Sequence, residues 1–177
     1  MIRPSTASDV PAITAIYSWN VLNGLGTFEE VPPSEGEMAR RREAVLGYGL
    51  PWLVAEEGGE VVGYAYAGPF RLRAAYRYTV EDSVYLAPDA VGQGIGRALL
   101  AALIRDCESL GLRQMIAGIG DSGNLASIAL HRSLGFEPRG VFTAVGFKFG
   151  RWVDVPWLQL ALNGGNEGVP SGPGLTF

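Results

Sequence analysis

The sequence predicts a single α/β domain in which helices flank a central mixed β-sheet. The chain has 177 residues, of which 47% are hydrophobic and 18% charged, and this composition is typical of one globular domain with a large core. Gly58-Gly59 stands between two apolar runs and is a strong hairpin signal, so the sheet begins antiparallel. Beyond the hairpin, strand-like and helix-like segments follow one another along the chain.

The first half of the chain is predicted to hold two helices and this hairpin. Ser8 or Asp9 caps a helix over residues 8–20, whose apolar side chains have helical spacing. After a segment rich in Gly and Pro, a second helix covers residues 34–46, and its basic run 40–42 is interpreted as a solvated face. The two strands of the hairpin are read from PWLVAEEGGEVVGYAYAG.

The second half is predicted to begin with a strand in TVEDSVYLAP, followed by a glycine-rich loop and a helix over residues 94–109 that ends at Gly111. RQMIAGIG is read as a buried strand, NLASIALHRSLG as a short helix, and residues 136–162 as the last strands. Residues 1–162 are therefore assigned to one domain. Residues 163–177 are rich in Gly and Pro, and we expect them to be disordered.

Composition also limits the class of function. Cys107 and His131 are the single cysteine and the single histidine, so no internal disulfide is expected and no metal is expected. The net charge of −4 argues against nucleic acid, because phosphate binding normally needs a basic face. No run approaches the ~20 apolar residues of a membrane span, and no export signal is recognised, so we expect a cytoplasmic protein with no membrane partner.

The loop in VYLAPDAVGQGIGRALLAALIRDC places Gly92, Gly94 and Gly96 between the strand and the helix. Glycines there leave backbone N–H groups open to an anion, and a helix N-terminus adds about half a unit of positive charge. A dinucleotide fingerprint fails because its third glycine would fall on Arg97. A nucleotide P-loop fails because the loop and helix contain no lysine.

Two interpretations of the glycine loop remain. A tight turn without a ligand is possible in principle, but it needs one glycine and the loop has three. A pyrophosphate held by successive N–H groups, with the rest of its molecule along an open strand, accounts for all three. The loop therefore suits coenzyme A.

Several separate stretches carry a family resemblance: TFEEVPPS, PWLVAE, VVGYAYAGPF, YTVEDSVYL, the pattern N-x-x-S-I-x-L-H-x-x-L-G-F at 124–136, and GFKFGRWVDVPWLQL. Together with the order of elements from Ile2 to about Leu162, they resemble the GNAT superfamily of acyl-CoA-dependent N-acyltransferases. Within it, the sequence is similar to the phosphinothricin and methionine sulfone (sulfoximine) acetyltransferase branch. The resemblance implies the GNAT fold and an enzyme that uses acetyl-CoA.

The resemblance implies that the thioester lies against the end of the strand, often beside a β-bulge, and the pyrophosphate against the loop. Val91 stands where the superfamily usually has Gln or Arg, so we expect weaker or rearranged binding with the function kept. Pro88 has no N–H and is consistent with the strand ending there. The cofactor-binding residues implied are Val84, Tyr85, Leu86, Gly92, Gln93, Gly94, Ile95, Gly96, Arg97 and Asn124.

Acyl transfer to an amine needs a neutral nitrogen, a polarised carbonyl and a proton for the departing thiolate. Glu81 and Asp82 point to opposite faces of a strand, so only one can face the cleft. By resemblance the base is Glu81, and Asp82 is expected to be a solvated acid at the strand end. Cys107 lies on the apolar stripe of its helix, which predicts a buried, inert thiol and therefore direct transfer in a ternary complex.

His131 shares one helix stripe with Asn124, Ser127 and Leu134, and this stripe is expected to face the opening of the sheet. A lone histidine on an apolar helix is often a core residue, whereas the resemblance makes His131 catalytic. Its ordinary pKa, about 6.5, suits either a proton donor to sulfur or a base, and the sequence leaves both open.

By resemblance, the acceptor is a small amino acid or analogue. Two arginines would clamp its carboxylate, unless they are only exposed loop charges, and two tyrosines would wall its side chain. The alternatives are a protein N-terminal or lysine acetyltransferase and a non-catalytic acyl-CoA-binding module, and the resemblance also implies a homodimer. The substrate-binding residues implied are Phe28, Arg71, Arg73, Tyr76 and Tyr78.

Overall fold

A seven-stranded sheet runs through the molecule in the computed structural model, which describes all residues, 1–177. The strands are β1 (Ile2–Pro4), β2 (Trp52–Glu57), β3 (Glu60–Pro69), β4 (Thr79–Leu86), β5 (Gln114–Gly118), β6 (Glu137–Lys148) and β7 (Arg151–Ala161). The helices are α1 (Val10–Asn23), α2 (Glu35–Gly47), α3 (Ile95–Ser109) and α4 (Leu125–Ser133).

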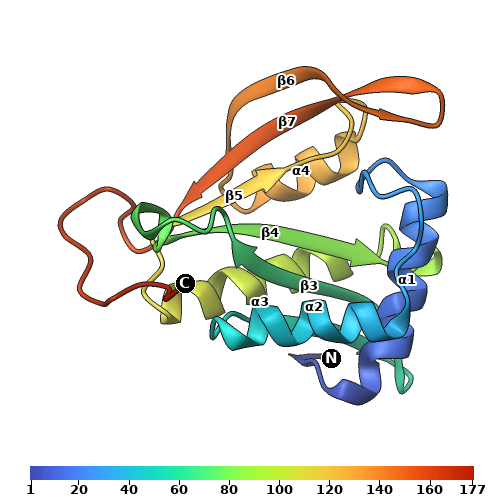
Figure 1. Cartoon of the computed structure of the whole chain (residues 1–177), viewed down its shortest axis with the longest axis horizontal. Helices are drawn as coiled ribbons and strands as arrows, with labels where there is room; N and C mark the ends of the chain where they lie inside the picture. Colours follow the sequence, from blue (N-terminus) through green and yellow to red (C-terminus); the bar gives the residue numbers. More distant parts are fainter.

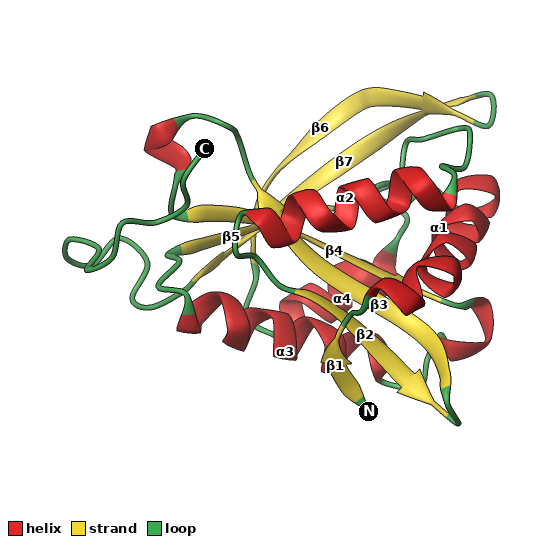
Figure 2. Ribbon diagram, turned by 60° about the horizontal axis from the view of Figure 1, so that its bottom comes forward, coloured by secondary structure: helices red, strands yellow, loops and turns green.

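The strand order is β1-β2-β3-β4-β5-β7-β6, and only the β4–β5 pair is parallel. Helices α1 and α2 cover one face of the sheet, and α3 and α4 cover the other (Figures 1 and 2). The predicted mixed sheet with flanking helices is thereby confirmed. The β6–β7 hairpin projects from the rest of the sheet at one side (Figure 1).

The local signals in the sequence explain most element ends. Gly58 and Gly59 both have positive φ, +59° and +88°, as the two-residue hairpin between β2 and β3 requires. Ser34 caps α2 by accepting a hydrogen bond from the N–H of Glu37, and Gly111 follows α3 with a φ of +76°. These helices and this hairpin lie where the sequence predicts them.

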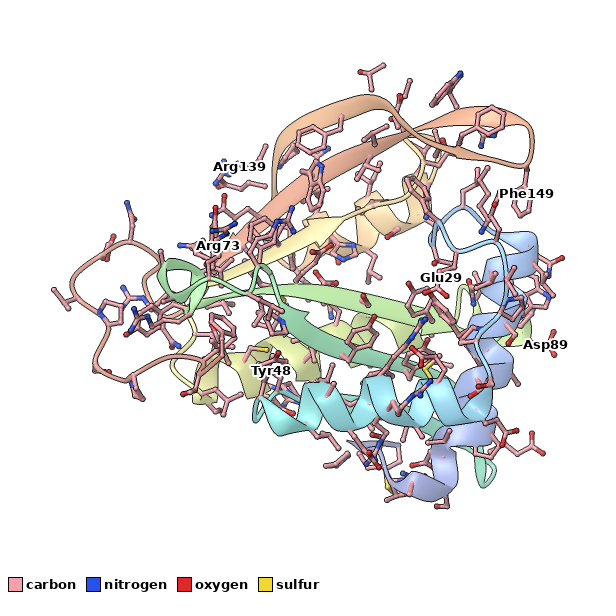
Figure 3. All side chains as sticks on the ribbon, in the orientation of Figure 1. Glu29, Tyr48, Arg73, Asp89, Arg139 and Phe149 are labelled. Atoms are coloured by element: carbon pink, nitrogen blue, oxygen red, sulfur yellow. The ribbon has the colours of Figure 1, made fainter.

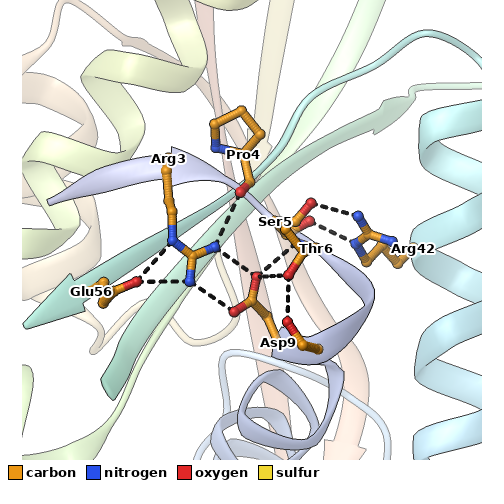
Figure 4. A network of polar contacts seen from close by, with 8 residues as sticks. Arg3, Pro4, Ser5, Thr6, Asp9, Arg42 and Glu56 are labelled. Atoms are coloured by element: carbon orange, nitrogen blue, oxygen red, sulfur yellow. Dashed lines mark hydrogen bonds and ion pairs between the residues drawn. The ribbon is translucent and has the colours of Figure 1, made fainter. Parts of the chain in front are cut away.

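Strand β1 is an element that the sequence analysis does not predict. It has three residues, too few to show a periodic pattern, and it pairs with β2 through Ile2 opposite Ala55. Its side chains join a polar network (Figure 4): the Arg3 guanidinium donates to Asp9 and Glu56, with Nη1 2.8 Å from Asp9 Oδ2. These hydrogen bonds hold the pKa of Asp9 well below its usual range.

The apolar stripe of α3 forms the centre of the core on its face of the sheet. Leu99, Leu100, Leu103 and Cys107 are all fully buried, as the helical spacing predicts. Burial raises the pKa of the Cys107 thiol far above its ordinary value, so the thiol stays protonated. This agrees with the buried, inert thiol that the sequence predicts.

The C-terminal segment, residues 163–177, is the part of the chain whose composition predicts disorder. It forms no helix or strand, but it is anchored at several points. Arg113 Nε donates to the Gly165 carbonyl at 2.8 Å, the N–H of Leu175 donates to the Arg77 carbonyl at 2.8 Å, and Leu175 packs on the core. Glycine and proline disfavour regular structure in this segment, and these contacts join it to the rest of the domain.

None of the helices combines the length and the apolar character that a membrane crossing requires.

Candidate active site

The sheet opens between β4 and β5. The two strands pair only over Thr79–Glu81 and Gln114–Ile116, and beyond Glu81 they separate, while β5 keeps β7 on its other edge. The β3–β4 register is continuous, so the β-bulge expected beside the thioester site is absent. Divergence of the strands, rather than a bulge, leaves the β5-facing edge of β4 open.

A cleft of about 580 Å³ fills this opening and continues along the glycine loop to α4. Gln93 and Ile95 do not line it, because the Gln93 amide donates to the Asp89 carbonyl and Ile95 is buried in the core. The other predicted cofactor residues do line it: Val84, Tyr85, Leu86, Gly92, Gly94, Gly96, Arg97 and Asn124.

The three loop glycines have different roles. Gly92 and Gly94 have positive φ, +82° and +81°, and a Cβ at either would meet nothing within 4 Å. Gly96 is buried, and a Cβ there would lie 3.5 Å from side-chain atoms of Leu86 and Leu130. The first two glycines therefore shape an open backbone surface, whereas the third is buried at the start of α3, where an added methyl group would make ordinary contacts.

Gly94 is the N-cap of α3 and supplies no side-chain cap. The first N–H groups of α3 have no partner within the helix, and they carry the positive end of its dipole to the cleft. Exposed Val91 and the backbone of Gly92 complete this rim. The rim fits the pyrophosphate of coenzyme A, since it offers N–H donors and space and places no acidic side chain among the residues that line it at the loop.

Asp82 is not the solvated acid expected from the sequence. Its side chain is 2% exposed, and its Oδ2 lies 3.0 Å from His131 Nε2. Val80 and Asp82 point to the α3–α4 face of β4, so Asp82 meets α4 instead of solvent. Its other oxygen, Oδ1, is buried without a hydrogen-bond partner beside the cleft.

His131 is buried, with both ring nitrogens occupied. Nδ1 lies 2.7 Å from the Ser127 carbonyl oxygen, which can only accept, so Nδ1 carries a proton and donates. A second proton then lies between Nε2 and the Asp82 carboxyl. Burial alone lowers the pKa of His131, but the hydrogen bond and charge of Asp82 and the Ser127 carbonyl outweigh it, and the pKa is raised. Three residues of the predicted stripe, Asn124, Ser127 and His131, line the cleft at the opening of the sheet, whereas Leu134 packs on the core. Asn124 caps α4, because its side-chain oxygen accepts a hydrogen bond from the N–H of Ser127.

Glu81 lies on the opposite face of β4, toward α1 and α2, and also borders the cleft. Burial raises the pKa of Glu81, the charge of Asp82 raises it further, and Arg71 lowers it in part. A Cβ added at Gly118 would lie 2.9 Å from the Trp157 ring and 3.3 Å from Glu81 Oε1. A carboxylate with a raised pKa, on an open and half-buried strand edge, is suited to accept a proton near neutral pH.

A second pocket, of about 280 Å³, lies on the same face of the sheet as Glu81. Ile116 forms its floor directly opposite Glu81 in the β4–β5 register. Aromatic rings wall it, and Arg71 and Arg139 bring positive charge to it. It is lined by Phe70, Arg71, Ile116, Arg139, Gly140, Phe142, Trp157, Leu158 and Gln159.

Only one of the predicted acceptor residues lines this second pocket. The Arg71 guanidinium stacks 4.4 Å from the Phe70 ring centroid, and the Tyr76 ring packs edge-on against Phe70 at 5.6 Å. Arg73 is exposed outside the lining (Figure 3), and the Tyr78 hydroxyl donates to the Gly172 carbonyl.

Phe28 lies elsewhere, against the β6–β7 hairpin. A Cβ at Gly146 would come within 2.3 Å of its ring. The sequence analysis also missed residues that the site contains: Asp82 as the partner of His131, and Arg139, Trp157 and Gln159 in the second pocket. The last three lie on strands far from the glycine loop in sequence, so only the β5–β7–β6 pairing brings them to Glu81.

An open strand edge leading to a helix N-terminus, with a carboxylate and a histidine beside it, defines an acyl-CoA-dependent acetyltransferase site. The model of the Acetyltransferase (GNAT) family matches residues 14–136, and the chain belongs to this family. The protein is an acetyl-CoA-dependent N-acetyltransferase.

Particular relatives are similar over nearly the whole chain. A phosphinothricin N-acetyltransferase of Alcaligenes faecalis is 54% identical over 96% of this chain and 86% of its own length. An L-methionine sulfoximine/L-methionine sulfone acetyltransferase of Pseudomonas paraeruginosa is 44% identical over 92% of this chain and 94% of its own. A crystal structure of a GNAT phosphinothricin acetyltransferase from Sinorhizobium meliloti in complex with acetyl-CoA is 52% identical, with a TM-score of 0.94 over 97% of this chain and 92% of that chain.

Proposed function

We propose that this enzyme acetylates the amino group of a small amino acid or analogue with a free carboxylate, such as phosphinothricin, methionine sulfone or methionine sulfoximine. The observation that carries the proposal is the second pocket, which joins aromatic walls and two arginines to the face of β4 that bears Glu81. The names of the similar proteins support the same class of acceptor.

The residues divide the work in a direct transfer within a ternary complex. Arg71 and Arg139 hold the acceptor carboxylate, and Glu81 removes a proton from its ammonium so that the nitrogen can attack the thioester carbon. Backbone N–H groups on the open edge of β4 polarise the carbonyl. The carbon–sulfur bond then breaks, the Asp82–His131 pair gives a proton to the departing thiolate, and the nitrogen releases its second proton as it becomes an amide, which leaves the pair to be reprotonated.

A panel of acceptors tests this function. Acetyl-CoA is supplied with amino acids, their amides, simple amines, and peptides with a free N-terminus or a lysine, and free thiol release is followed. Release with methionine sulfone or phosphinothricin and not with peptides supports the proposal. Release with peptides alone indicates a protein acetyltransferase, and acetyl-CoA binding without release with any acceptor indicates a binding module.

Arg71→Ala is expected to raise the KM for methionine sulfone about 10- to 100-fold, because a charge-assisted hydrogen bond to its carboxylate is lost. The KM for methionine sulfone amide should change much less. Arg73→Ala is the matched control, since this arginine lies two residues away and outside the pocket lining. Equal effects of Arg71→Ala on the acid and the amide would show that Arg71 does not bind the carboxylate.

We also propose a homodimer. The β6–β7 hairpin exposes a row of large apolar side chains, including a Phe147–Trp152 ring pair at 5.2 Å, and Trp152 is 65% exposed. β6 is an edge strand covered on neither face for most of its length. A second copy of the chain would bury this surface and protect the edge.

Trp152→Glu is therefore expected to convert a dimer to a monomer in sedimentation velocity, because it places a charge in the apolar surface. Val169→Glu adds the same charge at a residue that is 91% exposed in the C-terminal segment and should leave the dimer intact. A wild-type protein that sediments as a monomer at micromolar concentration would contradict the proposed dimer.

A further inference from the structure

The loop between α1 and α2 is held in place in an unusual way. None of residues 25–33 takes part in a backbone–backbone hydrogen bond. The loop is fixed through side chains instead: the Tyr17 hydroxyl and Thr27 Oγ1 lie 2.8 Å apart, and Arg41 binds Glu29 with Nη1 2.6 Å from Oε1. A segment with so few backbone bonds adopts one path only where side chains impose it.

This loop is also a wall of the cleft. Gly24, Leu25 and Gly26 line the cleft across from the open edge of β4. The Leu25 carbonyl packs against the chain just after β5, so closely that a Cβ at Gly120 would fall 1.9 Å from it. The position of the loop therefore sets the width of the cleft at the level of the β4–β5 opening.

Lys148 holds the α1–α2 loop in place through hydrogen bonds. It comes from the end of β6, is 1% exposed, and donates from Nζ to the carbonyls of Gly24 at 2.9 Å and Thr27 at 2.8 Å. Figure 3 shows the neighbouring Phe149 at the tip of the hairpin, beside the loop. The Phe28 ring against Gly146 makes a second contact between the same two segments.

Burying an ammonium group is unfavourable unless its N–H groups are paired. Burial accordingly lowers the pKa of Lys148, although the charges of Glu30 and Glu29 oppose this. Lys148 donates no hydrogen bond to a member of the proton path: its two side-chain hydrogen bonds both go to loop carbonyls. The two hydrogen bonds of this buried ammonium group therefore fix the position of the α1–α2 loop.

We propose that Lys148 is a positioning residue that holds the α1–α2 loop against the β6–β7 hairpin and so sets the width of the cleft at the β4–β5 opening, where the acceptor nitrogen must meet the thioester. The kinetic part of this proposal rests on the proposed amino-acid acceptor. The glycine loop that fits the pyrophosphate is a separate segment of the cleft wall, at the start of α3, and Lys148 does not bond to it. Loss of the lock should therefore affect the acceptor more than acetyl-CoA.

Lys148→Met tests the lock, because methionine keeps most of the length and apolar stem and loses all three N–H donors. Hydrogen exchange at the Glu29 amide, the loop N–H that donates to Thr27 Oγ1 at 3.3 Å, should become at least about 10-fold faster, as expected for a segment freed to open locally, while exchange in β3 stays unchanged. The kcat/KM for methionine sulfone should fall about 10- to 100-fold through misplacement of the acceptor, with the Kd for acetyl-CoA within about threefold.

Lys148→Arg, which keeps the charge and the donors, should restore most of the exchange protection and of kcat/KM. If Lys148→Met does not unfold cooperatively, Lys148→Gln is measured in its place, since its amide keeps donors for one carbonyl. Unchanged exchange in the loop, or loss of protection spread equally over β3, would overturn the proposal. The exchange experiment needs no acceptor, so its result tests the role of Lys148 even if the proposed function is wrong.

Discussion

Gly94→Asp is expected to abolish acetyl-CoA binding, whereas Gly94→Asn should retain much of it. Gly94 has a φ of +81°, and aspartate and asparagine tolerate this left-handed region better than other side chains, to a similar degree. The two variants therefore share their backbone strain and their shape. They differ in one negative charge at the N-terminus of α3.

The size of the effect follows from Coulomb's law. At an effective dielectric constant of about 20, two unit charges about 4 Å apart repel by about 4 kcal/mol, which is roughly 1000-fold in affinity. The space above Gly94 is open, so the new carboxylate would point to where the pyrophosphate is expected. It would also neutralise the positive end of the helix that attracts the anion.

Isothermal titration calorimetry of both variants with acetyl-CoA, at low and high salt, checks this result. Thermal unfolding serves as the control for folding. Gly96→Asp is not a useful alternative, because Gly96 is buried between Leu86 and Leu130 and the variant would perturb the core. Similar affinities of Gly94→Asp and Gly94→Asn for acetyl-CoA would show that the pyrophosphate does not bind at this loop.

The loop illustrates what the sequence could and could not supply. The alternation of glycines after a strand predicted an anion site at a helix N-terminus, because positive φ and open N–H groups are local properties. It did not show that Gly96, unlike Gly92 and Gly94, is buried. That burial depends in part on Leu130, which lies on another helix and meets Gly96 only in the folded protein.

The acidic pair shows the same limit. Alternation along a strand correctly predicts that Glu81 and Asp82 point to opposite faces. It cannot say which face solvent reaches, and here neither carboxyl is a simple surface acid: Asp82 is buried against His131, and Glu81 is half-buried at the opening of the sheet. The hydrogen bond that joins Asp82 to His131 spans 49 residues, so no local pattern encodes it.

The pocket for the acceptor depends most on tertiary structure. Arg71 was named through the family resemblance of its segment, but Arg139, Trp157 and Gln159 come from β6 and β7, and their strands meet Glu81 through β5. Lys148 is one charged residue in a β-rich run, a pattern that does not predict burial, and its 1% exposure arises only when the α1–α2 loop folds over it.

Glu81→Gln is expected to lower kcat by about 10²- to 10⁴-fold at neutral pH, the range typical of general-base catalysis, while acetyl-CoA affinity is retained. Glutamine keeps the size of the side chain and removes only the ability to accept the proton. Wild-type activity should rise with pH through the pKa of Glu81, which burial and then Asp82 raise, since the carboxyl must lose its proton before it can act as base.

The deficit of Glu81→Gln should become smaller at high pH. An acceptor amine with a solution pKa of about 8 or higher then arrives neutral more often and needs the carboxylate less. Asp89→Asn serves as a matched loss of one acidic side chain on the surface before the glycine loop, and it should leave the profile of kcat against pH unchanged.

His131→Phe should respond differently, because the Asp82–His131 pair holds a proton rather than awaiting one. The raised pKa of His131 keeps it protonated to higher pH, and its carboxylate partner is buried, so the variant loses a proton source and leaves Asp82 without its partner. Its deficit in kcat should persist until the pH passes the raised pKa of His131, where the wild type also loses this proton, and it should shrink with an acetyl thioester whose thiol is more acidic, since that thiolate leaves without being protonated. Measuring both variants across pH, with acetyl-CoA binding as the control, separates the two roles.

Two outcomes would contradict these assignments. Near wild-type kcat for Glu81→Gln at neutral pH would show that the base is the Asp82–His131 pair or water instead of Glu81. A deficit of His131→Phe that is the same with both thioesters would exclude proton delivery from His131 to sulfur.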